Sequence, residues 1–156
     1  MPPKWGQRTL TPFYRMVYFS LFLSGLLAAT LFPASSEVLL LALLQQGYSP
    51  LWLFVAATAG NTLGSCVNWY LGRRLLDFQH KRWFPVSAPA LERAQLQFQR
   101  FGSWSLLLAW LPVVGDPLTL VAGVLKVPFN LFLLLVLLGK AARYAVLIGA
   151  GSAWLT

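Results

Sequence analysis

The sequence predicts an all-α integral membrane protein that contains one structural unit twice, as an inverted repeat. Each unit is expected to hold a re-entrant helical hairpin and one transmembrane helix, with an amphipathic surface helix between the two repeats. Three observations predict this fold. Of 156 residues, 58% are apolar and only 10% are charged, whereas soluble domains carry about 25% charged residues. The apolar residues form long runs, and the chain matches itself when one half is shifted along the other.

The two longest uninterrupted apolar runs predict transmembrane helices. They cover residues 51–72 and 129–155, and a span needs about 20 residues. Trp52, Trp69 and Trp154 lie near their ends, as expected for aromatic anchors at the membrane interfaces. We therefore expect one membrane domain with these spans, preceded by hairpins at 16–46 and 103–126 and joined by a polar connector at 73–101.

The two hairpin regions are interrupted near their middles by proline, small residues and a carboxylate. The breaks comprise Pro33, Ser35, Ser36 and Glu37 in the first region, and Pro112, Gly115, Asp116 and Pro117 in the second. Proline ends helices because it lacks a backbone donor and restricts the residue before it. The following arms, 38–46 and 118–126, reach only about 15 Å, which is half the hydrocarbon thickness. This favours a re-entrant hairpin, and one kinked span per region remains the alternative.

The connector is expected to contain a surface helix. Ser87 and Pro89 form a helix start, with a capping serine and a first-turn proline. An apolar stripe is expected along one face of this helix, formed by Leu91, Gln95, Phe98 and Phe101.

The internal repeat is defined by a shift of 79 residues. Pro33, Glu37, Gly60 and Gly72 then meet Pro112, Asp116, Gly139 and Gly151. Each half has one full crossing, so the second half must be inverted relative to the first, which is the plan of many secondary transporters. The termini would share one face, and the more basic segment 73–101 would be cytoplasmic.

Four ionisable residues near the middle of the membrane are the candidate functional groups. Glu37 and Asp116 lie at equivalent breaks, and Lys140 and Arg143 share one face of the last span. Charges in the membrane interior are costly and therefore indicate a functional site. The carboxylates would suit proton binding. The cations, together with the two helix starts at the breaks, would favour an anion such as a lipid phosphate.

Polar and small residues also line the second apolar run at helical spacing. These are Thr58, Gly60, Asn61, Gly64, Ser65 and Asn68. The polar members would form hydrogen bonds between helices or line a site, and the glycines would let another backbone approach closely. An exposed glycine face would also allow a homo-oligomer.

A purely structural interpretation explains the same residues. Asp116 before Pro117 resembles a helix cap, and Ser35 or Ser36 could cap the arm after Pro33. Glu37 would then form an ion pair with Arg143, and the protein would be a scaffold that transports nothing.

Other residue types exclude several classes of function. Cys66 and His80 are each the single residue of their type, so no disulfide, metal site or other cofactor is expected. No nucleophile–base pair stands out, so an enzyme is disfavoured. The net charge of +8 is concentrated beside apolar runs, which favours membrane lipids over nucleic acid as partners. The first run is too long for a cleaved signal peptide.

The sequence resembles the DedA family, also called the SNARE-associated or VTT-domain family, and in particular its short YqaA-like bacterial branch. The resemblance extends from about Ser20 to Gly151. It is carried by the segments 33–37, 60–64, 70–73, 101–102, 110–116, 122–123 and 139–144.

This resemblance implies facing re-entrant hairpins and a bacterial inner-membrane location. It also implies that the protein moves lipids across the bilayer, either by transporting lipid phosphates or by scrambling phospholipids, with a link to the proton motive force. Glu37 matches the acidic residue of the family's first hairpin, and Pro112 matches the proline of the second. The family's arginines on either side of that proline are replaced here by Ala109 and Gly115. We infer that Lys140 and Arg143 supply this charge instead.

Overall fold

The computed structural model describes residues 12–29, 35–74, 82, 87–111 and 114–155. All regular structure within these residues is helical, which confirms the predicted all-helical class. The elements are α1 (Pro12–Ala28), α2 (Ser35–Gln45), α3 (Pro50–Arg74), α4 (Ala88–Phe101), the 3-10 helix η2 (Gly102–Trp110), α5 (Gly115–Val124) and α6 (Phe129–Leu155). The predicted break residues Pro33 and Pro112 lie outside the described part of the chain.

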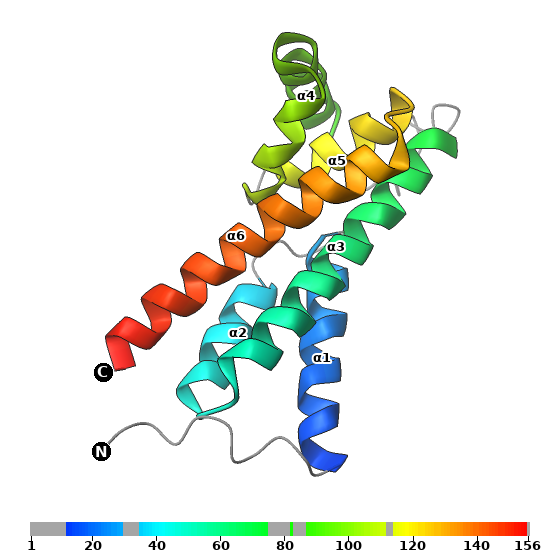
Figure 1. Cartoon of the computed structure of the whole chain (residues 1–156). Coiled ribbons are helices and arrows are strands. Elements are labelled where there is room, and N and C mark those ends of the chain that lie inside the picture. Colours follow the sequence, from blue (N-terminus) through cyan, green and yellow to red (C-terminus); the bar gives the residue numbers. More distant parts are fainter. Residues whose placement is uncertain (1–11, 30–34, 75–81, 83–86, 112–113, 156) are drawn as a thin grey trace.

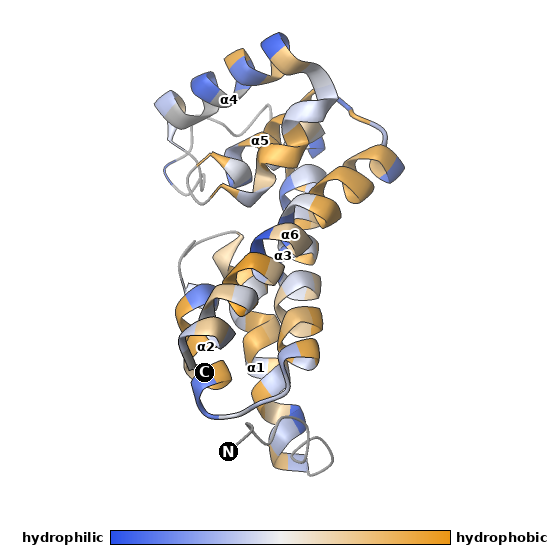
Figure 2. Ribbon diagram, turned by 60° about the vertical axis from the view of Figure 1, so that its left-hand side comes forward, coloured by the Kyte–Doolittle hydropathy of each residue, from blue (hydrophilic) through white to orange (hydrophobic). Residues whose placement is uncertain are grey.

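The two long helices α3 and α6 contact each other, and in Figure 1 both run from the lower left to the upper right. The pair α1 and α2 lies at the lower end of α3, and α4 and α5 lie at the opposite end (Figure 1). The last turns of α6 lie at the α1–α2 end. Hydrophobic residues predominate along α1, α2 and α6 (Figure 2). Many large apolar side chains of the long helices are exposed, among them Val67 of α3 and Leu134 of α6, which suits a protein surrounded by lipid.

The short elements pack on the long helices in a repeated pattern. The leading elements α1 and η2 pack on α3 and α6 respectively, while the trailing helices α5 and α2 pack on the long helix of the other half. Glycines permit the closest approaches. Gly60 of α3 faces the backbone of Phe22 in α1, and Gly139 of α6 faces that of Leu107 in η2.

The helices α2 and α5 end in the same type of turn. Gly47 and Lys126 both have positive φ angles, 84° and 57°, as in left-handed C-terminal caps. In both turns the next residue donates its N–H to a carbonyl five residues back, at 3.2 Å for Tyr48 to Leu43 and 3.0 Å for Val127 to Ala122. A shift of 79 residues aligns the two turns, so the matching extends to backbone conformation.

The lengths of the helices bear on the predicted spans. Within the described residues, the stretch Phe129–Trp154 of α6 is long and apolar enough to cross a membrane. Helix α3 has 25 residues, but its polar side chains lower its hydropathy. Residues 51–72 therefore stay a predicted span on the basis of length.

The helix predicted in the connector is present as α4, but its predicted apolar stripe is partly wrong. Phe98 is buried, whereas Gln95 is exposed and Phe101 is 52% exposed. The helix ends at Phe101, and Gly102 redirects the chain with a φ of 63°. Phe101 therefore lies at the end of the helix and is not held over the core. The side chain of Leu91 is outside the described set.

Candidate functional site

Four charged residues meet where α2, α5 and α6 converge on the centre of the molecule. Glu37 lies in the first turn of α2 and Asp116 in the first turn of α5. The Lys140 ammonium lies 3.1 Å from an Asp116 carboxylate oxygen, and the Arg143 guanidinium pairs with the Glu37 carboxylate. Because Lys140 and Arg143 share one face of α6, this helix holds both acidic residues at once.

In both ion pairs the cation is nearly buried and the carboxylate is partly exposed. The Lys140 side chain is 1% exposed and that of Arg143 is 8% exposed, while the two carboxylates keep partial exposure. Removing one partner of a buried pair leaves an uncompensated charge, which costs about 3–5 kcal/mol. The four residues together carry no net charge, which is the least costly arrangement for ionised groups away from water.

A chain of hydrogen bonds extends from Lys140 to the other half of the protein. Lys140 donates from Nζ to Oδ1 of Asn61 at 2.5 Å, and Asn61 donates from Nδ2 to the Tyr144 hydroxyl at 2.7 Å. The Tyr144 hydroxyl shares a further hydrogen bond of 2.8 Å with the Ser36 hydroxyl. Asp116 is thus connected to Ser36 through three buried side chains that come from both halves.

The predicted cap at Asp116 is wrong. The N-cap of α5 is Val114, which makes no side-chain capping bond, and Asp116 lies inside the first turn. Its carboxylate accepts a hydrogen bond from Lys140, because the cation offers a stronger partner than a backbone N–H. The Ser36 hydroxyl, the other predicted cap, bonds to Tyr144.

Gly115 packs closely against the preceding 3-10 helix. A Cβ atom at Gly115 would overlap the backbone of Ala109. This packing therefore leaves no room for a side chain at position 115. Ala109 is itself buried. Pro117 is buried and Ser35 is exposed.

The polar stripe of α3 serves mainly to join helices. Asn68 donates from Nδ2 to the Ala29 carbonyl at 2.9 Å and to the Thr119 hydroxyl at 3.3 Å. Ser65 donates to the Asn61 carbonyl within α3 at 3.2 Å. The buried Thr58 hydroxyl has no hydrogen-bond partner within the described residues.

The glycine face of α3 is occupied within the chain. A Cβ atom on Gly64 would lie 2.7 Å from the Leu26 carbonyl oxygen, and Gly60 faces the Phe22 backbone. Helix α1 therefore covers both glycines, and this face is not open to a second copy of the chain. The expectation that it is exposed is wrong.

Tyr144 is the central residue that sequence reasoning missed. Its side chain is completely buried and its hydroxyl joins Asn61 to Ser36. The sequence offers one signal for this role. Tyr144 lies beside Arg143 in an apolar helix, and a tyrosine hydroxyl that is buried usually has a hydrogen-bond partner.

The pair Glu37–Arg143 borders a cavity within the described residues. The cavity has a volume of about 490 Å³, and Trp110 and Val146 also line it. Both cations are thus nearly buried, and Arg143 lines this cavity. In this part of the chain, no three His, Cys, Asp or Glu side chains gather as a metal site would require.

The helical fold and the long apolar helix α6 are consistent with a helical membrane protein. The chain belongs to the VTT domain family, whose sequence model matches residues 32–153. The resemblance to the DedA family, in its YqaA-like branch, is therefore confirmed.

Three relatives indicate the range of the family. The Inner membrane protein YqaA of Escherichia coli is 42% identical over 133 residues, covering 85% of this chain and 89% of that protein. An uncharacterized protein of Haemophilus influenzae is 38% identical, with 82% and 83% covered. The Undecaprenyl phosphate transporter A of Staphylococcus aureus is 28% identical, with 80% and 68% covered. No solved structure matches the chain.

Proposed function

We propose that this protein moves anionic lipids, of the lipid-phosphate class, across the bacterial inner membrane. The observation that carries the proposal is the position of Arg143. Its guanidinium is held by Glu37 at the centre of the molecule and also borders an open cavity. A guanidinium has five N–H donors, so it can hold a carboxylate and bind a phosphate oxygen together.

One comparison supports the lipid-phosphate class, and another supports the inner-membrane location. One relative is named an undecaprenyl phosphate transporter and another an inner membrane protein. Lys140 would act as the fixed positive charge of the site, because Asn61 and Asp116 hold it in an enclosed position. Glu37 and Asp116 would exchange protons during transport.

The proposal includes a topology. Each of the pairs α1–α2 and η2–α5 would enter the membrane and return to the face from which it entered. The two halves, residues 16–72 and 102–155, would be inverted relative to each other. The connector 73–101 would be cytoplasmic. The matching turns after α2 and α5 support this plan, as does the reciprocal packing of the short helices on α3 and α6.

Transport in proteoliposomes tests the function. We expect the purified protein to move a fluorescent polyprenyl phosphate between leaflets, and Arg143→Gln and Glu37→Gln to reduce the rate about tenfold or more, as expected for loss of a charged contact. Glu92→Gln, on the exposed side of α4, is the matched control. Unchanged rates in Glu37→Gln and Asp116→Asn would overturn the role of the carboxylates.

Cysteine labelling tests the topology separately. Single cysteines at Phe101, Asp116 and Lys126 are introduced into a Cys66→Ala background and treated with a membrane-impermeant reagent. The hairpin requires that positions 101 and 126 react from the same side. Labelling from opposite sides would replace the hairpin with a kinked span.

A second candidate function is a scaffold without transport activity. The observation that favours it is that both cations of the centre are paired and that their bonds join the two halves. A scaffold would tolerate the exchanged pair Glu37→Arg with Arg143→Glu, whereas a transporter that binds phosphate through Arg143 would lose its activity.

A further inference from the structure

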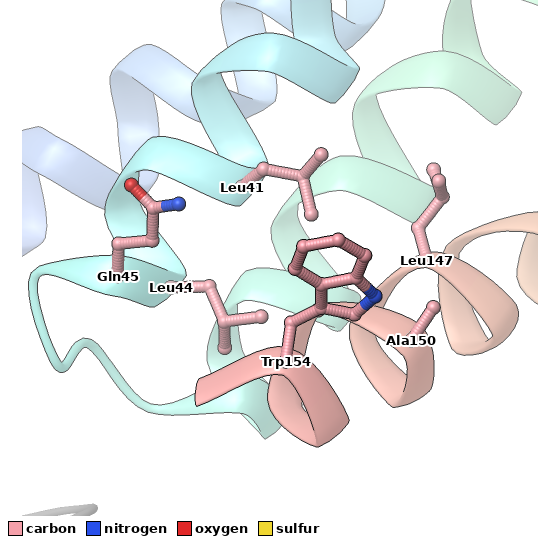
Figure 3. Close-up of a pocket in the computed structure, with 7 residues that line it drawn as sticks. Leu41, Leu44, Gln45, Leu147, Ala150 and Trp154 are labelled. Carbon is pink, nitrogen blue, oxygen red and sulfur yellow. The ribbon is translucent and has the colours of Figure 1, made fainter. Parts of the chain in front are cut away.

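Two cavities that share Leu147 form a groove between α2 and α6, and the inner one borders the charged centre. Its outer part has a volume of about 370 Å³ and lies between Leu41 and Leu44 of α2 and Ala150 and Trp154 of α6 (Figure 3). Its inner part is the cavity of about 490 Å³ beside Arg143. Leu147 lines both parts, so the two cavities adjoin.

The groove follows one face of each helix. Glu37, Leu41 and Leu44 are spaced three and four residues apart on α2, which places them on one side of the helix. On α6 the lining extends from Arg143 to Trp154 at similar spacing. That stretch is about 16 Å long at 1.5 Å per residue, close to half of a hydrocarbon core of ~30 Å.

The equivalent pair of helices in the other half is closed, and the sequence explains the difference. Gly72 of α3 faces the backbone of Leu120 in α5, and Gly123 of α5 faces the backbone of Trp69 in α3. The 79-residue shift aligns Gly72 with Gly151 and Gly123 with Leu44. A Cβ atom at Gly151 would instead meet the Leu44 side chain, at 2.8 Å. In the first half, the Leu44 side chain therefore keeps α2 away from α6. In the second half, Gly123 at the equivalent position lets α5 contact α3.

The chemistry of the lining changes along the groove. The outer part is bordered mainly by leucine and alanine side chains, by the polar side chain of Gln45 and by Trp154, whose indole ring lies between the two helices (Figure 3). Trp154 is 92% exposed, so it borders the groove without filling it. The charged groups of the lining, Arg143 and Glu37, lie at the inner end.

We propose that this groove holds the hydrocarbon chain of a single lipid whose anionic headgroup binds Arg143. The inference rests on the proposed function and adds the position of the lipid chain. An apolar groove of this length, with the Arg143 guanidinium at its inner end, matches a single hydrocarbon chain that carries an anionic headgroup at one end.

The polarity of the groove fixes the orientation of the lipid. The headgroup would lie at the centre of the protein, and the chain would extend toward the Trp154 end. A lipid at rest in that leaflet has the reverse orientation, with its headgroup at the surface. The groove therefore fits a lipid that has entered from the opposite leaflet and is halfway across.

Photocrosslinking tests the occupant directly. A benzophenone amino acid replaces Ala150, which lines the groove, or Ala145, which is exposed on α6 and does not line it. The full-length protein is reconstituted in phosphatidylcholine vesicles that contain an alkyne-tagged polyprenyl phosphate. We expect labelling from position 150 to saturate and to be lost when untagged polyprenyl phosphate is added, and labelling from position 145 to fall only as the probe is diluted.

Competitors identify the ligand chemistry. Inorganic phosphate should not reduce labelling from position 150, because the chain supplies the binding in the groove, whereas an uncharged polyprenol should compete more weakly than the phosphate. Full competition by inorganic phosphate, or labelling at position 150 that never saturates, would overturn the proposal.

A transport measurement separates this inference from the proposed function. We expect Ala150→Phe, which fills the groove, to slow transport about tenfold, and Ala145→Phe to leave it unchanged. If the wild type transports and both variants match it, the groove assignment fails and the function stands. If the wild type transports nothing but position 150 still crosslinks saturably, the proposed function fails and the lipid site stands.

Discussion

Asn61 and Lys140 are 79 residues apart in the sequence and form a hydrogen bond of 2.5 Å at the centre of the molecule. The same shift that aligns Glu37 with Asp116 aligns these two residues. One position carries an amide in the first half and a cation in the second. An asparagine can accept from the ammonium and donate to Tyr144 at the same time, which a second lysine could not do.

The first prediction concerns the buried cation. Lys140→Met leaves the Asp116 carboxylate without its partner, so we expect the free energy of unfolding to fall by about 3 kcal/mol. Thermal unfolding in detergent, followed by tryptophan fluorescence, measures the loss. Arg93→Met on the exposed surface of α4 is the control and should unfold like the wild type.

A double variant shows whether the loss comes from the unpaired charge. Lys140→Met combined with Asp116→Leu removes both charges, and we expect most of the lost stability to return. A double variant as unstable as the single one would show that Lys140 stabilises the fold by some other contact.

The second prediction concerns the tyrosine at the centre. Tyr144→Phe removes the hydroxyl that joins Asn61 to Ser36 and leaves two buried polar groups without that partner. We expect a loss of about 1–3 kcal/mol, seen as a lower unfolding temperature. Tyr70→Phe, at an exposed position of α3, removes the same atom and should change little. Equal behaviour of the two variants would contradict the role of Tyr144.

The third prediction concerns the contact between α3 and α5. Gly123→Ala places a Cβ atom against the backbone of Trp69, and we expect destabilisation of about 2 kcal/mol from overpacking. Gly149→Ala adds the same atom where nothing lies within 4 Å. It should be neutral or stabilising by about 0.5–1 kcal/mol, since glycine is a poor helix former. Chemical denaturation of both proteins in micelles gives the comparison.

The fourth prediction concerns the turn after α5. Lys126 has a φ of 57°, a conformation that costs a side-chain-bearing residue about 1 kcal/mol. Lys126→Gly should therefore stabilise the protein by about that amount, and Gly47→Ala at the aligned turn should destabilise it. If both variants raised the unfolding temperature, or both lowered it, the two turns would not be matched left-handed caps.

Much of the helical layout could be predicted from the sequence, because apolar runs and prolines act locally. The predicted span at 129–155 coincides with α6, and the span at 51–72 lies within α3. The short arms begin at Ser35 and Gly115, three residues earlier than predicted, because the small and acidic residues after each break are compatible with a first helical turn.

The site was less predictable because it depends on how the helices rotate against one another. Sequence spacing brings Lys140 and Arg143 to one face of α6, and the structural interpretation paired Glu37 with Arg143, as the structure does. The pairing of Lys140 with Asp116 was not predicted, because it depends on where α2 and α5 pack. Those positions follow from close backbone contacts at residues such as Gly115 and Gly123, which a one-dimensional pattern does not reveal. The role of Tyr144 was missed for the same reason.

The pairing of Ser36 and Glu37 with the far end of the chain has a consequence for biosynthesis. Ser36 and its partner Tyr144 are separated by 108 residues, which a ribosome adds in roughly 5–20 s at ~5–20 residues per second. The time between the synthesis of Glu37 and that of its partner Arg143 is about the same. The nascent first half must therefore keep a carboxylate hydrated, or shielded by the insertion machinery, until α6 emerges and completes the fold.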